Sequence, residues 1–188
     1  CWQVRIYDEK DVAGPWSEPV TFEMGLLKKE DWEGQWICGD YTPEEGIRYP
    51  ADEFRKKFIL PEKKIVSARL YMTACGCYET FLGGEKVGNL VLAPGTTNYD
   101  VRIQYQTYDV TEMLIPGENY WDITLGDGWF RGKMGAFGAS HVYGDITAVL
   151  GQLEISFEDG TFMRIATDKD FSWSNDGPVR FNDMKDGE

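Results

Sequence analysis

Two segments rich in polar and aromatic side chains carry most of the functional chemistry in this sequence. The first spans residues 92–111 and the second spans residues 125–132. Both combine planar rings, amides and carboxylates with glycine turns, and the second adds an arginine. Planar rings stack on the faces of sugars, and these polar groups exchange hydrogen bonds with sugar hydroxyls. The two segments therefore indicate carbohydrate recognition, and no other part of the chain has a catalytic pattern.

Composition excludes several other classes of protein. The chain has 188 residues, of which 42% are hydrophobic and 14% aromatic, as expected for a folded protein with a sizeable core. Its 32 acidic and 19 basic residues give a net charge of −13. That balance argues against binding to nucleic acid or to anionic membranes, which requires clustered lysine and arginine. It favours neutral or cationic ligands.

The elements that must position these residues are predicted to be short strands. Apolar and polar residues alternate over short stretches that end at glycine or proline, and no helical period persists over three turns. Thr111–Leu114 suits a single helical turn. Such a pattern predicts an all-β jelly-roll sandwich of the galactose-binding type. The expected strands are 3–7, 16–23, 54–60, 68–74, 78–82, 85–88, 104–110, 121–125, 149–157, 162–167 and 178–181.

The same pattern predicts two domains joined by a linker. Residues 1–25 are predicted to be the last strands of an immunoglobulin-like or fibronectin-like domain, because two strands alone cannot bury a core. Residues 26–35 read as a linker, and residues 36–188 as the jelly-roll module.

The four cysteines, at positions 1, 38, 75 and 77, are expected to be free and mostly buried. Cys75 and Cys77 are two residues apart in a predicted strand, so they would share a face and could not easily form a disulfide. A cross-link through Cys1 or Cys38 is the alternative. A single histidine and the lack of a Cys-x-x-Cys pair argue against zinc. Free thiols favour the bacterial cytoplasm, with the periplasm or secretion as alternatives.

The order of motifs along the chain resembles that of bacterial α-L-rhamnosidases. Trp16–Pro19, Gly25–Leu27 and Gln35–Ile37 are similar to the opening of that family. Further motifs resemble its N-terminal β-sandwich module. These are Phe54–Lys56, Ala68–Tyr71, Val91–Gly95, Gln104–Thr111, Gly126–Trp129, Gly177–Phe181 and Asp186–Glu188.

This resemblance implies a parent enzyme that hydrolyses terminal α-L-rhamnose in glycosides or glycans. In the family, catalysis belongs to an (α/α)₆ barrel further along the chain, and inverting hydrolysis needs two carboxyl groups about 6.5–9.5 Å apart. The present sequence ends before such a barrel, so we expect no catalytic residue in it and no activity from it alone. No cofactor is required. The expected partners are a rhamnose-containing ligand and the catalytic barrel of the same polypeptide.

The resemblance also suggests a sugar site. Some modules of this type resemble rhamnose-binding lectin-like domains, in which calcium, a cation that prefers six to eight oxygen ligands, helps to hold the sugar hydroxyls. Asn98 and Asp100 are the candidate calcium ligands, and Asp127 could add a third oxygen. Trp129 could stack on rhamnose, and Arg131 could donate hydrogen bonds to it.

Each of these residues also has a structural interpretation. Asn98, Asp100 and Asp127 are common turn residues, Trp129 could fill a core or an interface, and Arg131 could pair with a surface carboxylate. Under that interpretation the glycine-rich segment 126–138 docks on the barrel and the module acts as a support. A stand-alone carbohydrate-binding or adhesion module without a hydrolase is the alternative from another functional class.

Overall fold

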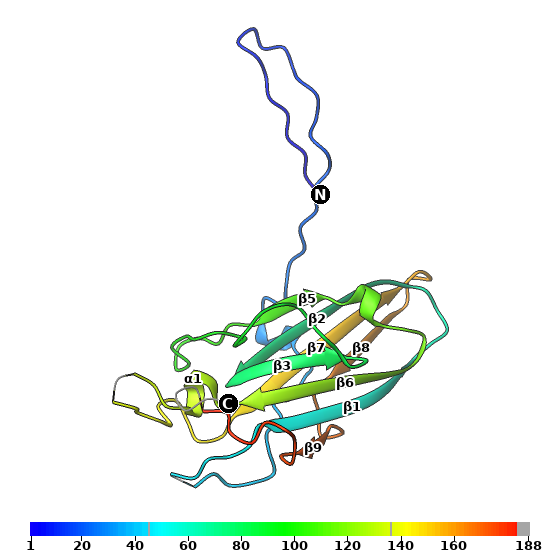
Figure 1. Ribbon diagram of the computed structural model, residues 1–188. Helices are drawn as coiled ribbons and strands as arrows, with labels where there is room; N and C mark the ends of the chain where they lie inside the picture. The colour runs from blue at the N-terminus through cyan, green and yellow to red at the C-terminus, as the bar shows by residue number, and fades with distance from the viewer. Residues whose placement is uncertain (45, 136, 184–188) are drawn as a thin grey trace. The chain divides into compact units, whose positions relative to one another are not determined.

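The computed structural model describes residues 1–44, 46–135 and 137–183 (Figure 1). Glu45 and the predicted Asp186–Glu188 motif lie outside these ranges. The chain divides into two compact units, residues 1–32 and 33–188. Among the described residues, no helix is long and apolar enough to span a membrane.

The first unit is a hairpin whose two arms are joined by isolated hydrogen bonds. Trp2 and Val20 exchange both backbone hydrogen bonds, and the Ser17 amide donates to the Val4 carbonyl. The predicted strands 3–7 and 16–23 therefore lie opposite each other, but they do not form a continuous ladder. Pro15 and Pro19 lack the amide hydrogen that a ladder needs, which interrupts the pairing. A short 3-10 helix, η1 (Lys29–Asp31), completes the unit.

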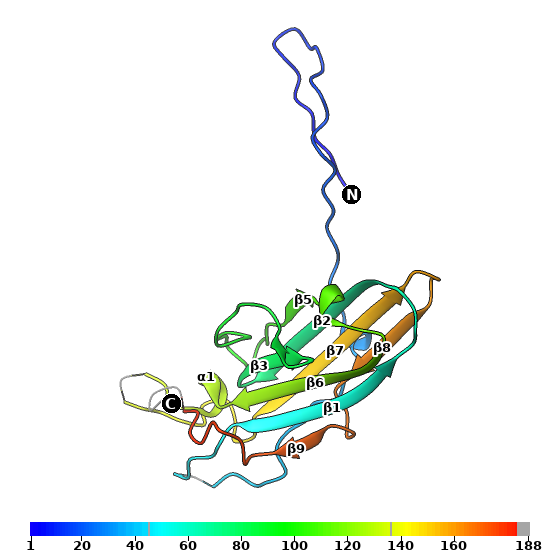
Figure 2. The same cartoon turned by 45° about the vertical axis from the view of Figure 1, so that its right-hand side comes forward.

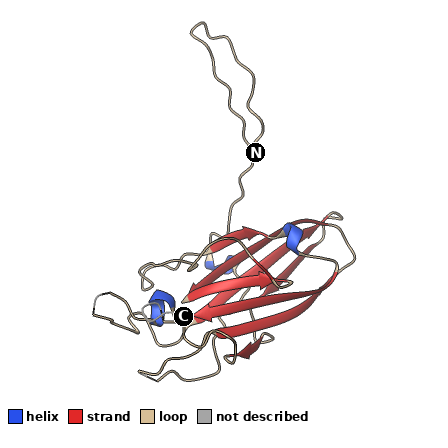
Figure 3. Cartoon of the chain, viewed as in Figure 1, coloured by secondary structure: helices blue, strands red, loops and turns tan. Residues whose placement is uncertain are grey.

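The second unit is a sandwich of two antiparallel sheets (Figures 2 and 3). Within the described ranges, one sheet has the order β4-β3-β6-β1-β9 and the other has the order β5-β2-β7-β8. The prediction of an all-β sandwich is confirmed. The strands are β1 (Asp52–Leu60), β2 (Ile65–Cys75), β3 (Cys77–Leu82), β4 (Glu85–Lys86), β5 (Gln106–Asp109), β6 (Gly117–Gly126), β7 (Ala148–Phe157), β8 (Phe162–Ala166) and β9 (Ser172–Ser174).

The alternation of inward and outward side chains along the strands explains how the two sheets pack together. Every second residue of β2 from Ala68 to Ala74 is fully buried, as is the inward series Trp121, Ile123 and Leu125 of β6. The Trp121 indole donates a hydrogen bond of 2.8 Å to the Thr80 hydroxyl, so its only polar atom is satisfied inside the core. A 3-10 helix, η2 (Thr111–Met113), forms where the sequence predicted a single helical turn.

The prediction of a final strand at residues 178–181 is wrong. The last strand is Ser172–Ser174, which pairs with β1, whereas residues 178–181 form no strand. Pro178 has no amide hydrogen to donate, and the backbone bond from the Ala51 amide to the Val179 carbonyl is an isolated contact rather than part of a ladder.

The cysteine prediction also needs correction. Cys75 ends β2 and Cys77 begins β3, and these strands belong to different sheets. Gly76, with a φ of 145°, turns the chain between them, so the two thiols do not share a strand face. All four cysteines are free, but Cys1 and Cys38 are exposed rather than buried. Burial raises the pKa of Cys75 and of Cys77 to about 11, which keeps both thiols protonated and unreactive.

We predict that Gly151→Ala destabilises the sandwich. A Cβ atom at this position would lie 2.5 Å from the Met72 sulfur and 2.7 Å from the Trp121 ring, so the core must shift at a cost of about 1–3 kcal/mol. Urea denaturation measures the change. Gly126→Ala is the matched control, because its Cβ would lie at an ordinary 3.4 Å from Asn182. Equal stability of the two variants would contradict the packing described here.

Candidate polar pocket beside helix α1

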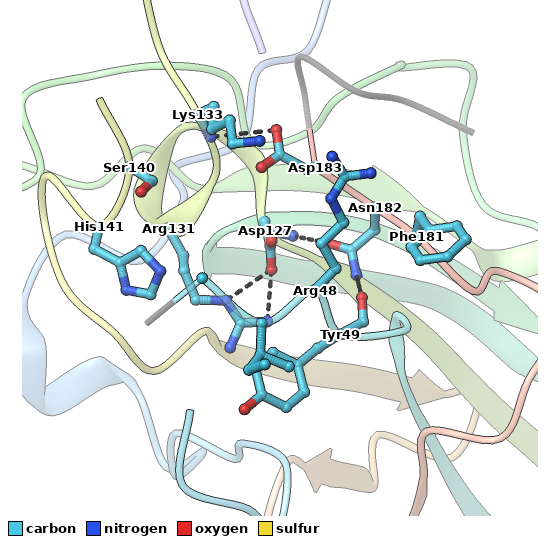
Figure 4. Close-up of a pocket in the computed structure, with 12 residues that line it drawn as sticks. Arg48, Tyr49, Asp127, Arg131, Lys133, Ser140, His141, Phe181, Asn182 and Asp183 are labelled. Atoms are coloured by element: carbon cyan, nitrogen blue, oxygen red, sulfur yellow. Dashed lines mark hydrogen bonds and ion pairs between the residues drawn. The ribbon is translucent and has the colours of Figure 1, made fainter. Parts of the chain in front are cut away.

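Polar side chains gather in a pocket of about 210 Å³ beside the short helix α1 (Gly128–Arg131), directly after β6 (Figure 4). Four stretches of the chain, 46–49, 127–133, 140–141 and 181–183, contribute to its walls. The lining residues are Gly46, Ile47, Arg48, Tyr49, Asp127, Arg131, Lys133, Ser140, His141, Phe181, Asn182 and Asp183.

A buried ion pair lines this pocket. Two nitrogens of Arg131 contact the same Asp127 oxygen, Nε at 2.7 Å and Nη2 at 2.5 Å. The side chains of Arg131 and Asp127 are only 4% and 13% exposed. Burial raises the pKa of Asp127, and the charge of Arg131 opposes that rise. The expected pairing of Arg131 with a carboxylate is present, but it is buried rather than at the surface.

Two stacked tyrosine rings lie beside Arg131, and one of them, Tyr49, lines the pocket. The Tyr41 and Tyr49 rings stack with centroids 4.7 Å apart, and the guanidinium lies 5.8 and 5.5 Å from their respective centroids. Arg131 Nη1 also donates a hydrogen bond of 3.0 Å to the Tyr41 hydroxyl. The guanidinium is therefore held by a carboxylate, a hydroxyl and two π faces, which compensates for the loss of its water shell.

A second buried carboxylate, Asp52, extends the network. It is 1% exposed and accepts a hydrogen bond of 2.9 Å from the Trp173 indole. The Tyr41 hydroxyl, 3.4 Å away, links it to Arg131. Burial raises the pKa of Asp52, while the bonds from Trp173 and the charge of Arg131 oppose the rise.

Asn182 connects the C-terminal segment to this network. Its Oδ1 accepts a hydrogen bond of 2.6 Å from the Asp127 amide, and its Nδ2 donates to the Tyr49 carbonyl at 2.9 Å. Sequence reasoning singled out neither Asn182 nor Asp52. Asp52 stands at the start of a strand and Asn182 in a tail, and only the fold brings them to α1.

The other predicted sugar residues lie outside this pocket. Asn98 and Asp100 are exposed, and the Asp100 amide donates to Asn98 Oδ1 at 3.1 Å in a local turn. Between them Tyr99 is buried, and its ring packs against that of Phe130 in α1 with centroids 5.3 Å apart. The turn and the helix are therefore neighbours. Trp129 is half-buried and does not line the pocket.

The donor set for calcium is sparse. Among the residues that the structure describes, no three His, Cys, Asp or Glu side chains are close enough to share a metal ion. Asn98 Oδ1 already accepts a hydrogen bond, and Asp127 contacts Arg131. Calcium binding at Asn98 and Asp100 stays a prediction.

The sequence comparisons identify the family. Residues 63–188 match the family model described as Alpha-L-rhamnosidase N-terminal domain. The chain belongs to that family. Residues 1–28 match a second model, Rha78A-like, N-terminal immunoglobulin domain. Both models describe N-terminal domains rather than a catalytic domain, and the resemblance inferred from the motifs is confirmed.

Curated relatives that match this chain are named α-L-rhamnosidase. An α-L-rhamnosidase of Formosa agariphila is 34% identical over 193 residues, which cover 100% of this chain and 21% of the relative. The chain thus spans about a fifth of the length of the curated relatives that it matches.

Solved structures agree with the fold. The α-L-rhamnosidase of Aspergillus terreus is 37% identical with a TM-score of 0.92, over 99% of this chain and 22% of that one. The Streptomyces avermitilis enzyme, solved with L-rhamnose, is 44% identical with a TM-score of 0.73, over 76% of this chain and 14% of that one. A Pleurotus ostreatus lectin, with 19% identity and a TM-score of 0.52 over 80% of this chain and 37% of that one, shares the fold.

We predict that Asp52 makes stability depend on pH in the opposite direction to an ordinary paired carboxylate. Its folded pKa is raised above the unfolded value, so its stabilising contribution is complete below the unfolded pKa and is lost as pH rises through the folded pKa. The measurement is the free energy of unfolding of the wild type minus that of Asp52→Asn, from urea denaturation between about pH 4 and 8. The difference should fall as pH rises, and a constant or rising difference would contradict the assignment.

Proposed function

We propose that this chain is the N-terminal accessory module of an α-L-rhamnosidase that removes terminal α-L-rhamnose from glycosides or glycans. The family match and the shared name of the relatives support the activity of the whole enzyme. The catalytic domain would lie in the same polypeptide, since the matched relatives are about five times as long as this chain.

Within that enzyme, we propose that the module supports the catalytic domain. The observation that carries this role is the buried Asp127–Arg131 pair. Both side chains were candidates for contacting a sugar, yet each is held by the other. Their shared contacts join α1 to Tyr41 and to Asn182, which would fix the loops at this end of the sandwich in one arrangement.

Rhamnose binding by the module is the second candidate function. The polar pocket beside α1 supports it, since Ser140 and His141 line the pocket along with the ion pair. His141 Nδ1 lies 2.8 Å from Asp145 Oδ1, which orients the ring, and its backbone has a strained φ of 57°. The relative from Streptomyces avermitilis was solved in complex with L-rhamnose.

Assignment to a hydrolase rather than to a stand-alone adhesion module is tested by activity. The 188-residue chain should release no p-nitrophenol from p-nitrophenyl α-L-rhamnoside. The two carboxylates of the candidate site, Asp127 and Asp52, are held in the buried network and are not free to act as a catalytic acid and base. A longer polypeptide that includes the region following residue 188 should release it. Absorbance of p-nitrophenolate measures both rates. An inactive longer polypeptide would favour the adhesion module, and turnover by the short chain would overturn the accessory role.

A titration separates support from sugar binding. L-rhamnose is added to the 15N-labelled chain with calcium and then with EDTA, and amide shifts are recorded. The support role predicts flat spectra at tens of millimolar sugar. Saturable shifts at the α1 pocket would replace it with a rhamnose-binding role. Shifts at Asn98 and Asp100 that vanish on chelation would instead establish the predicted calcium site.

A further inference from the structure

The outer face of the five-stranded sheet carries a groove that is separate from the α1 pocket. In Figures 1 and 2, the middle of β6 and β1 has no other element drawn across it. A depression of about 450 Å³ crosses this face, from Phe81 and Gly84 at the β3–β4 hairpin to Ser172 and Ser174 on β9. It therefore runs across the strands rather than along them.

Strand register aligns one row of side chains with this groove. Phe81 lies opposite Asp122, Asp122 opposite Arg55, and Arg55 opposite Ser172. Residues directly opposite each other in an antiparallel sheet project from the same face. Four strands at about 4.8 Å spacing make this row about 14 Å long, which exceeds the size of a single sugar ring.

A second row runs beside the first, two residues along each strand. It comprises Glu79, Thr124, Glu53 and Ser174, again in direct register. The two rows together alternate carboxylates, hydroxyls and a guanidinium. Hydroxyl groups of a ligand both donate and accept hydrogen bonds, so such a surface can satisfy them in either direction.

Charges on this face are largely matched. Arg55 makes two contacts with Asp122, at 2.5 and 3.1 Å, and Lys86 pairs with Glu79. The Arg55 side chain is nevertheless 64% exposed, so its remaining hydrogen-bond donors face solvent. Glu53 adds a further carboxylate to the groove. On a chain with a net charge of −13, this strip beside an aromatic ring disfavours an acidic ligand and favours an uncharged one.

We propose that this groove binds a short stretch of a neutral, linear oligosaccharide. The Phe81 ring packs against the C–H face of one sugar at the end of the groove. Asp122, Arg55 and the serine hydroxyls of β9 hydrogen-bond the hydroxyls of the sugars that follow. Because both rows of side chains run across the strands, the bound glycan also lies across the strands. This site goes beyond the proposed function, since it would hold the polymer and not the terminal rhamnose.

The test is an NMR titration of the 188-residue chain with linear neutral hexasaccharides of glucose, xylose or galactose. L-rhamnose and a galacturonate hexasaccharide are the comparison ligands. At least one neutral hexasaccharide should give saturable amide shifts in β1, β3, β6 and β9, and the acidic one should not. Asp122→Asn, which keeps the shape of the side chain, should weaken binding at least tenfold, as should Phe81→Ala.

Lys57→Gln is the matched control. Lys57 lies on the same face of β1 and pairs with Glu118, but it does not line the groove, so its loss should leave the affinity unchanged. Thermal melting verifies that each variant folds. Three results would overturn the proposal: no saturable shifts with any neutral hexasaccharide, shifts confined to the α1 pocket, or tighter binding of the galacturonate. L-rhamnose binding at α1 alone would favour the rhamnose-binding role over the support role and would argue against the groove.

Discussion

The buried pairing of Arg131 with Asp127 is the constraint on which this end of the sandwich depends. The Arg131 side chain is 4% exposed, and a buried guanidinium is stable only where protein groups replace the water that it loses. Here a carboxylate, a tyrosine hydroxyl and two stacked rings replace that water. Removing either charge would leave the other charge unpaired in a buried, low-dielectric site. The network therefore links Tyr41 and Tyr49, helix α1 and Asn182 to one another.

Most of the sandwich could be predicted from the sequence because its strands have one buried face. The alternation in β2 and β6 gives the inward residues directly, and glycine and proline positions mark the turns. The prediction failed where alternation does not determine the structure. Proline interrupts the hairpin near the N-terminus and residues 178–181, while Gly76 moves the chain from one sheet to the other within a single residue.

The pocket could be predicted only in part. Asp127 and Arg131 stood out because they share a short glycine-flanked turn, and the structure brings them together. Asp52 and Asn182 could not be placed beside them, because they are about 75 and 55 residues away from Asp127 in the sequence. The pairing of β1 with β6 brings Asp52 close, and a hydrogen bond from the Asp127 amide to the Asn182 side chain brings Asn182 close. The residue types in segments 92–111 and 125–132 predicted carbohydrate recognition, but they could not distinguish side chains that contact a ligand from side chains that hold the fold.

The most direct test of this account is a double-mutant cycle on Asp127→Ala and Arg131→Ala, with the free energy of unfolding measured by urea denaturation. If the pair holds α1 to its surroundings, each single variant is strongly destabilised and the coupling energy lies between about 1 and 3 kcal/mol. Arg180 and Asp176, which also pair at four residues' separation but are 50% and 92% exposed, provide the reference cycle, expected below about 1 kcal/mol. A coupling energy for Asp127 and Arg131 no larger than that of the exposed pair would contradict the account.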